Sequence, residues 1–363
     1  MRVAIAGGGT GGHVFPALAV AEELLARAPG SEVLFVGSSG GLEERLIPAH
    51  GYRLELLKVG KLKGASSVVR MRTLAGLPGA LARALGILRR FDPQVLVGVG
   101  GFASGPMALA AWLRHCPVVL LEQNAIPGLT NRVLARLASR VVVSFAEATA
   151  RFPRGRAVLL GNPLRRPLVA ALARSGPPHG APRSLLVLGG SQGARRVNEL
   201  MVAAAPAIFR VHPGLRLVHQ TGAADETWVA ERYREAKLSV EVRPFIDDVA
   251  AAYREANLVI SRAGATTCAE LCLAGKPALL VPYPFAADDH QRANARALES
   301  TGGALVLSQQ ELEPAQLADE VIRLFSDPQL LLRMGAALRT AARPDAAARV
   351  VALLEELVYH PAP

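Results

Sequence analysis

The chain is poor in cysteine and has no long apolar run. Its 363 residues include three cysteines, too few for a disulfide framework, and this indicates a reducing compartment. No run of about 18 apolar residues occurs, which argues against a transmembrane helix. The first residues are not typical of a signal peptide, because glycines interrupt the apolar run and Glu22 and Glu23 follow it. We expect a soluble globular protein with room for two domains.

Metal-ligand spacings are also scarce. Cys268 and Cys272 have no other cysteine or histidine near them in the sequence, so buried small hydrophobic residues are the better interpretation. Asp288, Asp289 and His290 are consecutive and lack a recognisable ligand spacing. We therefore predict no metal site.

Basic residues outnumber acidic ones and give a net charge of +11. The segment 58–90 holds eight basic residues and no acidic one, and its leucines from Leu74 to Leu88 recur at helical spacing. This apolar stripe is either part of the core or an exposed face with a basic rim. The second form suits an anionic membrane surface, at about 1 kcal/mol per basic residue. Nucleic acid is not an expected partner, because the segment has almost no aromatic residues for base stacking.

Short apolar runs alternate with helical patterns in two sets, the first from VAIAG to RVVVSF and the second from SLLVLGG to PALLVPYP. Strands this apolar are typical of parallel sheets with helices on both faces. A Pro- and Gly-rich stretch at 161–183 separates the sets and indicates a linker. The sequence thus predicts an α/β protein with two Rossmann-like, doubly wound domains facing a cleft.

Each set opens with a glycine loop between a strand and a helix, GGTGGH at 8–13 and GGSQGA at 189–194. The first loop fits G-x-G-x-x-G, but the following strand ends without a carboxylate for a nicotinamide ribose. A P-loop would need lysine where His13 stands. The loop is compatible with a pyrophosphate held by backbone amides, because this requires only the glycines and a helix N-terminus.

Eight motifs together resemble the MurG family of peptidoglycan glycosyltransferases, which transfer N-acetylglucosamine (GlcNAc) from UDP-GlcNAc to lipid I and so form lipid II. In chain order they are GGGTGGHVFPALA, VGVGGFASGP, EQNAIPGLTN, GNPLR, GGSQGARRVN, RPFIDDV, SRAGATTCAEL and DDHQRANA. One departure is Leu121, where the family often has histidine. The resemblance implies the glycosyltransferase-B fold. It assigns residues 1–161 plus 343–363 to an acceptor- and membrane-binding domain, and residues 162–342 to a UDP-GlcNAc-binding domain.

The resemblance also implies roles in donor binding. Ser191 and Arg165 would contact the UDP phosphates, and Glu270 would accept hydrogen bonds from the ribose hydroxyls. Ile246 would bracket the uracil, and two amides would read the GlcNAc hydroxyls. The full predicted set is Thr10, Gly11, Gly12, Asn124, Arg165, Ser191, Ile246, Ala265, Thr266, Thr267, Glu270 and Gln291.

Structural roles remain open for several of these residues. Arg165 and Ile246 are also compatible with a surface arginine and a core isoleucine. Glu270 is also compatible with a glutamate that only complements a helix dipole, at a helix start that Thr266 and Thr267 would cap.

No D-x-D sequence, with which many glycosyltransferases hold a divalent cation, occurs in the chain. Backbone amides, a helix dipole and Arg165 would then stabilise the leaving group. We expect no required cofactor, although stimulation by Mg²⁺ stays open.

His13 is the predicted general base for the acceptor hydroxyl, because imidazole titrates near neutral pH and a helix N-terminus keeps it neutral. Glu122 is the alternative base, and a histidine that only orients the loop is the structural alternative. The resemblance implies that the acceptor's pyrophosphate binds at the first-domain loops. The predicted residues are Gly9, Gly12, Gly101, Ser104 and Gly105.

Lipid I is anchored in the membrane by its polyprenyl tail, and this favours the segment 58–90, with Trp112, as a docking surface for an anionic membrane. The implied location is peripheral, on the cytoplasmic face of the cell membrane. Three alternatives remain. A UDP-GlcNAc epimerase would need a second acid/base pair, an NAD-dependent oxidoreductase would bind nicotinamide, and a non-catalytic nucleotide-sugar binder would lack turnover.

Overall fold

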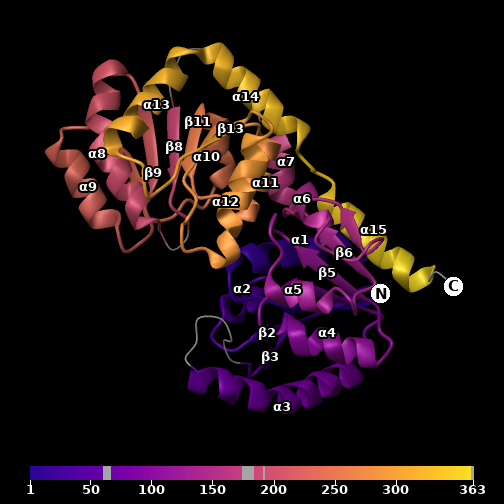
Figure 1. The fold of residues 1–363 in the computed structure, drawn as a ribbon. Coiled ribbons are helices and arrows are strands. Elements are labelled where there is room, and N and C mark those ends of the chain that lie inside the picture. The colour runs from indigo at the N-terminus through magenta and orange to yellow at the C-terminus, as the bar shows by residue number, and fades with distance from the viewer. Residues whose placement is uncertain (60–66, 174–183, 191–192, 361–363) are drawn as a thin grey trace. The chain divides into compact units, whose positions relative to one another are not determined.

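The structure is a computed structural model that describes residues 1–59, 67–173, 184–190 and 193–360, with side chains of the helix starting at Ser67 described from Gly76 onward. It divides into two compact units, Met1–Arg166 with Arg343–Pro363, and Pro167–Ala342. We call these the first and the second domain (Figure 1).

The first domain has a seven-stranded parallel sheet in the order β3-β2-β1-β4-β5-β6-β7. The strand order reverses between β1 and β4, so the loops that follow these two strands emerge side by side at the carboxyl edge of the sheet. The strands are β1 (Arg2–Gly7), β2 (Glu32–Ser38), β3 (Arg53–Leu57), β4 (Val95–Gly100), β5 (Val118–Glu122), β6 (Arg140–Val143) and β7 (Ala157–Leu159).

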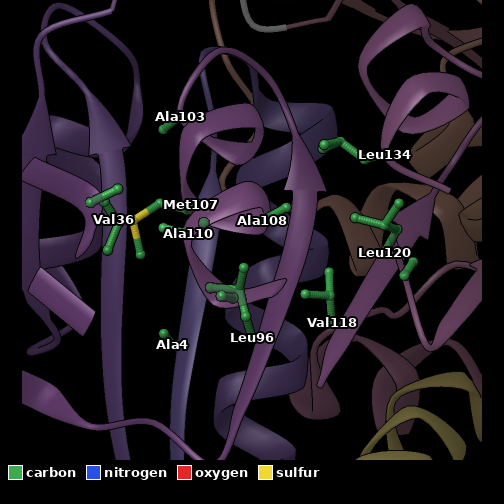
Figure 2. Packing of buried hydrophobic residues seen from close by; sticks show 14 of the residues in the cluster. Ala4, Val36, Leu96, Ala103, Met107, Ala108, Ala110, Val118, Leu120 and Leu134 are labelled. Carbon is green, nitrogen blue, oxygen red and sulfur yellow. The ribbon is translucent and has the colours of Figure 1, made fainter. Parts of the chain in front are cut away.

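Helices cover both faces of this sheet. One buried cluster joins the sheet to α3 and α4 and includes Leu96 and Met107, which Figure 2 shows. The other joins it to α1 and α15, which pack together although they come from opposite ends of the chain. The helices are α1 (Gly11–Arg27), α2 (Glu43–Ala49), α3 (Ser67–Phe91), α4 (Ser104–Leu113), α5 (Leu129–Leu134), α6 (Ala146–Thr149) and α15 (Ala346–Tyr359).

The second domain has a six-stranded parallel sheet in the order β10-β9-β8-β11-β12-β13, with the same reversal between its first strand and β11. Its strands are β8 (Ser184–Leu188), β9 (Arg216–Gln220), β10 (Glu241–Arg243), β11 (Leu258–Ser261), β12 (Ala278–Leu280) and β13 (Ala304–Val306). Its helices are α7 (Arg166–Ala173), α8 (Arg195–Val211), α9 (Glu226–Glu235), α10 (Val249–Glu255), α11 (Ala265–Ala274), α12 (His290–Glu299), α13 (Pro314–Ser326) and α14 (Pro328–Thr340).

The prediction of two doubly wound α/β domains is confirmed, and each domain carries a glycine loop after its first strand. The observed division falls five residues later than the sequence-based boundary after residue 161. Arg165 pairs with Glu22 and Arg166 pairs with Glu23, and these ion pairs hold the connecting segment against α1 of the first domain.

The basic segment 58–90 contributes partly to the core. Ile87 and Leu88 are buried in the first domain, and Leu81 and Leu85 pack against the same cluster, so the core interpretation holds for this half of α3. Leu77 is exposed, and residues 60–66, like the side chain of Leu74, lie outside the described residues. Within the described part of the chain, no helix is both long enough and apolar enough to span a bilayer.

Candidate active site

The loop after β1 is locked to the loop after β4. Gly7, Gly8 and Gly9 have φ values of +134°, +147° and +89°, which disfavour residues with a Cβ atom. The Gly8 N–H donates to the Gly100 carbonyl oxygen at 3.2 Å. A Cβ atom on Gly101 would lie 2.6 Å from the Gly8 oxygen, so the two loops touch backbone to backbone.

Ser104, at the start of α4, fastens the ends of β1 and β4 to each other. Its buried Oγ lies 2.7 Å from the Ala6 carbonyl oxygen and 3.0 Å from that of Gly100, and it accepts the Gly100 N–H at 3.1 Å. The hydroxyl is thus engaged inside the domain. The predicted pyrophosphate contact of Ser104 therefore depends on its backbone N–H, which is in the first turn of α4, as is that of Gly105.

His13 occupies the first turn of α1, and its ring turns back onto the glycine loop. Its Nδ1 lies 2.9 Å from the Gly8 carbonyl oxygen and 3.4 Å from Thr10 Oγ1. A carbonyl oxygen can only accept, so the proton of the neutral ring is on Nδ1 and the lone pair is on Nε2. The Nε2 atom is close to Gly100, where a Cβ atom would approach it to 2.9 Å. The ring therefore presents an acceptor nitrogen beside the β4 loop.

Sequence reasoning missed Glu43, which is 1% exposed and supports the glycine loop from α2. Its Oε2 accepts the Gly9 N–H at 2.6 Å, and its Oε1 accepts the N–H and the Oγ–H of Ser38, both at 2.9 Å. A Cβ atom on Gly8, Gly37 or Gly41 would collide with this side chain. The glycines that precede Glu43 are the one feature of the sequence that could have indicated its buried position. In other respects Glu43 and the exposed Glu44 look alike in the sequence.

The bond to Glu43 changes how the loop can bind an anion. The Gly9 amide, one of the predicted pyrophosphate contacts, already donates to a carboxylate. Gly11 and Gly12 are the first two residues of α1, and their N–H groups have no partner four residues earlier within the helix. These amides, at the positive end of the helix dipole, are the better anion donors in this loop.

Glu122, the alternative base, ends β5 and is 2% exposed. Its Oε1 accepts from the Asn124 backbone N–H at 3.0 Å and from Asn124 Nδ2 at 3.4 Å. Its Oε2 accepts from the Gly128 N–H at 3.0 Å and from Asn131 Nδ2 at 2.9 Å. Four donors use its lone pairs, so this geometry favours a role in shaping the loop 123–131 over a role as the base.

Arg165 lies in the first domain and forms an ion pair with Glu22. Its Nε and Nη2 are each 2.7 Å from Glu22 Oε1. The predicted contact of Arg165 with the donor phosphates would require the guanidinium to use its remaining N–H groups or to leave this pair.

The second glycine loop follows β8, and Gly190 and Gly193 adopt φ values of +80° and +77°. A Cβ atom on Gly193 would lie 2.6 Å from the Thr221 carbonyl oxygen, so this loop lies against the end of β9. The predicted phosphate contact Ser191 lies outside the described residues.

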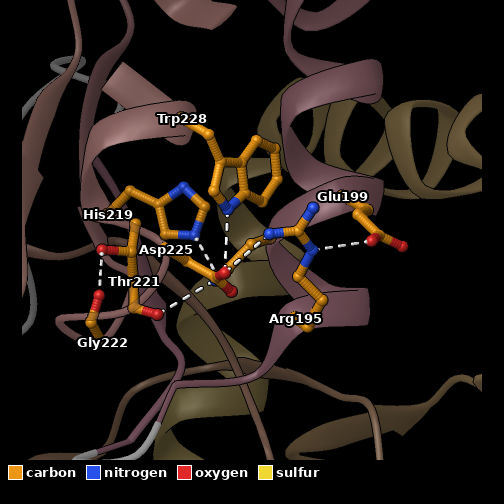
Figure 3. Close-up of polar contacts among 8 residues, drawn as sticks. Arg195, Glu199, His219, Thr221, Gly222, Asp225 and Trp228 are labelled. Carbon is orange, nitrogen blue, oxygen red and sulfur yellow. Dashed lines mark hydrogen bonds and ion pairs between the residues drawn. The ribbon is translucent and has the colours of Figure 1, made fainter. Parts of the chain in front are cut away.

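A polar network around Asp225 supports the start of α8 (Figure 3). The Asp225 carboxylate accepts from Arg195, Asn198 and Trp228, each at 2.8 Å. The Arg195 guanidinium also lies 4.1 Å from the centre of the Trp228 ring. Burial raises the pKa of Asp225, but hydrogen bonds from Trp228, Arg195 and Asn198 outweigh this and lower it.

His219 lies under the same network and is fully buried. It bonds the Tyr233 hydroxyl through Nδ1 at 2.9 Å and Asn198 Oδ1 through Nε2 at 3.0 Å. Burial lowers the pKa of His219 to about 3, although Asp225 partly opposes this shift. The imidazole is therefore neutral at physiological pH and acts as a structural connector.

Glu270 projects from α11 toward α10, where its Oε2 accepts the Tyr253 hydroxyl at 3.0 Å. Burial raises the pKa of Glu270 to about 7, and the Tyr253 bond partly opposes this. The predicted capping role of Thr266 and Thr267 is wrong. Helix α11 begins at Ala265 with Gly264 as its N-cap, so the threonines lie inside the first turn and Glu270 lies in the second. Glu270 is thus not a helix-dipole residue at the N-terminus.

Of the other predicted donor contacts, Thr10, Gly11, Gly12 and Asn124 lie in the first domain, and Ile246 and Gln291 lie in the second. Ile246 is buried in the loop between β10 and α10. Gln291, in the first turn of α12, accepts the Tyr283 N–H through Oε1 at 3.0 Å and keeps its amide NH₂ for other partners. Among the residues that the structure describes, no group of three or more His, Cys, Asp or Glu side chains could hold a metal ion.

Two parallel-sheet α/β domains, each with a glycine loop after its first strand, have the glycosyltransferase-B fold, and the family models identify the class as a glycosyltransferase. Residues 3–143 match the glycosyltransferase family 28 N-terminal domain, and residues 184–350 match its C-terminal domain. A crystal structure of Acinetobacter baumannii MurG is 33% identical in sequence and has a TM-score of 0.79. The match covers 98% of this chain and 99% of that one.

Curated relatives extend this similarity along the whole chain. A protein of Geobacter metallireducens is 47% identical over 97% of both chains. A protein of Anaeromyxobacter dehalogenans is 45% identical over 99% of this chain and 93% of its own. Both are named UDP-N-acetylglucosamine--N-acetylmuramyl-(pentapeptide) pyrophosphoryl-undecaprenol N-acetylglucosamine transferase. The chain belongs to glycosyltransferase family 28. Within this family it belongs with the N-acetylglucosamine transferases just described.

Other solved structures share only the fold. A UDP-GlcNAc 2-epimerase from Neisseria meningitidis bound to UDP-GlcNAc is 12% identical and has a TM-score of 0.67. Epimerases therefore share this fold, and the similarity to them does not identify the reaction of this chain.

Proposed function

We propose that this chain transfers GlcNAc from UDP-GlcNAc to the 4-hydroxyl of the N-acetylmuramic acid (MurNAc) of lipid I, with inversion at the anomeric carbon, and so forms lipid II. The full-length similarity to transferases of that name supports the substrates. The observation that carries the mechanism is the orientation of His13, whose Nδ1 is held by the Gly8 carbonyl so that Nε2 carries the lone pair.

His13 acts in this proposal as the general base. Inversion needs one in-line displacement, in which the acceptor hydroxyl attacks the anomeric carbon, loses its proton to Nε2, and displaces UDP. The position in the first turn of α1 disfavours the imidazolium and keeps the ring ready to accept a proton. Glu122, saturated by four donors, shapes the neighbouring loop instead.

The acceptor's pyrophosphate binds at the helix starts beside His13. The N-termini of α1 and α4 follow the two interlocked loops, so the amides of Gly11, Gly12 and Gly105 are close to the base that deprotonates the acceptor. Gly9 and Gly101 contribute shape, because the Gly9 amide donates to Glu43 and Gly101 packs on Gly8.

The second domain binds the donor. Glu270 accepts hydrogen bonds from the ribose hydroxyls, and the start of α8 with Ser191 binds the diphosphate. The buried network around Asp225, which fixes Arg195 at the start of α8, supports this arrangement. No metal ion is required, because amides and the helix dipole stabilise the leaving group.

The chain acts on the cytoplasmic face of the cell membrane, where lipid I presents its sugar. The docking surface is the segment 58–90 together with Trp112, which is 48% exposed at the end of α4. Leu81, Leu85 and Leu88 of this segment take part in the core, and residues 60–66 with the side chains of 67–75 lie outside the described residues. Stronger binding to anionic than to neutral vesicles is expected, and equal binding would remove its electrostatic part.

The reaction is tested with radiolabelled UDP-GlcNAc and a lipid I analogue. A labelled disaccharide product in the wild type is expected. His13→Ala should cut turnover by about 10² or more and leave UDP-GlcNAc binding within about twofold. Release of a free epimerised sugar without transfer would contradict the function, and near-normal turnover of His13→Ala would contradict the base.

A further inference from the structure

Glu43 and His13 bind opposite ends of one peptide group. The peptide that joins Gly8 to Gly9 donates its N–H to Glu43 Oε2 at 2.6 Å and accepts the His13 Nδ1–H at its carbonyl oxygen at 2.9 Å. In a trans peptide the N–H and the C=O point in opposite directions, so the carboxylate and the imidazole lie on opposite sides of this unit. The chain thus contains a continuous carboxylate–peptide–imidazole series.

The peptide group can transmit charge between the two side chains. A carboxylate that accepts an amide N–H makes a short, charge-assisted hydrogen bond and polarises the amide, which places more negative charge on its carbonyl oxygen. That oxygen then holds the Nδ1–H more strongly and favours a proton on Nε2. An orienting carboxylate acts in the same way when it contacts a catalytic histidine directly.

The surroundings keep the carboxylate in this role. The Ser38 N–H and Oγ–H fix Oε1, and glycines at 8, 37 and 41 leave room for the buried side chain. The carboxylate of the series is shielded from solvent, since Glu43 is 1% exposed.

Other charged groups on the elements packed against α1 are more remote from the loop or exposed. These elements are β1, β4, α2 and α15. On α2, Glu44 and Arg45 are exposed, and β4 carries no ionisable side chain. The one ionisable residue of β1 is at the end opposite to the loop, and Glu355 of α15 pairs with Arg27 in the last turn of α1.

We propose that Glu43 is a positioning residue that acts on His13 through the Gly8–Gly9 peptide, fixing the Nδ1–H tautomer and raising the basicity of Nε2. This role rests on the proposed function of His13 as the base. No proton crosses the peptide, because the Gly9 N–H and the Nδ1–H remain on their nitrogens while Nε2 takes the acceptor's proton.

Nuclear magnetic resonance of the ¹⁵N-labelled imidazoles tests this inference directly in the full-length protein. The chain has eight histidines, and His13 is assigned by the signals lost in His13→Asn. The wild type should show the Nδ1–H tautomer. Glu43→Gln, which keeps the size and removes the charge, should lower the pKa of His13 by about 0.5–1 unit. The same tautomer and pKa of His13 in both proteins would overturn the inference. An Nε2–H tautomer in the wild type would be enough to overturn it, whatever the variant shows.

Two control variants separate charge from packing. Glu44→Gln alters the neighbouring carboxylate, which accepts the Gly40 N–H at 2.8 Å, and should leave His13 unchanged. Ser38→Ala removes one hydrogen bond to Glu43 but keeps its charge and its bond to Gly9, so the pKa of His13 should stay within about 0.2 unit. A shift in Ser38→Ala as large as that in Glu43→Gln would mean that loose packing, and not charge, is responsible.

Kinetics then link the effect to the reaction. The acidic limb of kcat/KM for the acceptor should move to lower pH in Glu43→Gln, with kcat reduced about tenfold and UDP-GlcNAc binding unchanged. An unchanged limb in this variant would overturn the catalytic part of the inference. The two hypotheses fail in different ways. Normal activity of His13→Ala would contradict the role of His13 as the base, whereas an unchanged pKa of His13 in Glu43→Gln would contradict only the role of Glu43.

Discussion

The pH dependence of donor binding is the sharpest test of the second domain. Burial raises the pKa of Glu270 to about 7, so its protonation changes within the range where the enzyme can be handled. An ionised carboxylate can accept hydrogen bonds from both ribose hydroxyls, whereas a protonated one must donate at one oxygen. The Tyr253 hydroxyl donates to Oε2, and no hydrogen bond among the described residues reaches Oε1.

The expected magnitude follows from the ionised fraction. With a pKa of about 7, the carboxylate is about 90% ionised at pH 8 and about 10% ionised at pH 6. If only the ionised form binds the ribose, affinity for UDP-GlcNAc falls about tenfold over this interval, or about 1.4 kcal/mol. At pH 7, binding should release about half a proton, because the donor selects the ionised form.

Calorimetric titration with UDP-GlcNAc from pH 5.5 to 8.5, in buffers of different ionisation enthalpy, measures both quantities. UDP-GlcNAc is the preferred probe, because its pyrophosphate is esterified at both ends and has no ionisation near neutral pH, whereas a terminal phosphate titrates near pH 6. Glu270→Gln should bind more weakly at pH 8 and lose the pH dependence. A wild type with flat affinity, or a Glu270→Gln variant with the wild-type slope, would refute the assignment of Glu270 to the ribose.

The raised pKa of Glu270 means that the folded state holds a proton that the unfolded state releases, so stability is lost as the pH rises to about 7. Glu270→Gln should therefore raise the free energy of unfolding by about 1–3 kcal/mol at pH 8 and little at pH 5, and urea unfolding without this difference would contradict the assigned pKa. Gly100→Ala should reduce turnover by at least about tenfold, since φ is +93° and the new Cβ would press on His13. Donor binding should persist in this variant, and the control Gly30→Ala should leave turnover unchanged. Normal turnover of Gly100→Ala would disprove the close packing of Gly100 against His13. Asp225→Ala should lower the free energy of unfolding by about 2–4 kcal/mol, against about 0.5 kcal/mol or less for the exposed Glu235→Ala, and an equal loss in both would show that the network is not stabilising.

The fold was predictable because its signals are local. An apolar strand, a glycine loop and a helix occur in that order twice, and the same order appears around Gly9 and Gly193 in the structure. The first-turn position of His13 followed from the same pattern. The helix start of α11 was predicted less well, because Gly264 and Thr266 are both acceptable N-caps and only the backbone conformation distinguishes them.

Roles that depend on long-range contacts could not be predicted. Apart from the glycines that precede Glu43, nothing in the sequence separates it from Glu44, although Glu43 is buried among donors from two segments and Glu44 is exposed. The family resemblance implied a pyrophosphate contact at Ser104, yet its hydroxyl fastens two strand ends. The leucine stripe of α3 has helical spacing whether its partner is the core or a membrane, and only packing shows that Leu88 is buried.

Three buried carboxylates at the carboxyl edges of the two sheets appear at first to oppose the binding of anions there. Glu43 follows β2 and Glu122 ends β5 in the first domain, and Asp225 follows β9 of the second. Each accepts at least three hydrogen bonds from its own domain, so its charge is compensated before any ligand arrives. The helix starts of α1, α4 and α8 keep their first N–H groups at the same edges. In the proposed function, the carboxylates thus shape the loops while the helix N-termini bind the diphosphates, and this division would let acidic side chains and anionic substrates share one edge of a sheet.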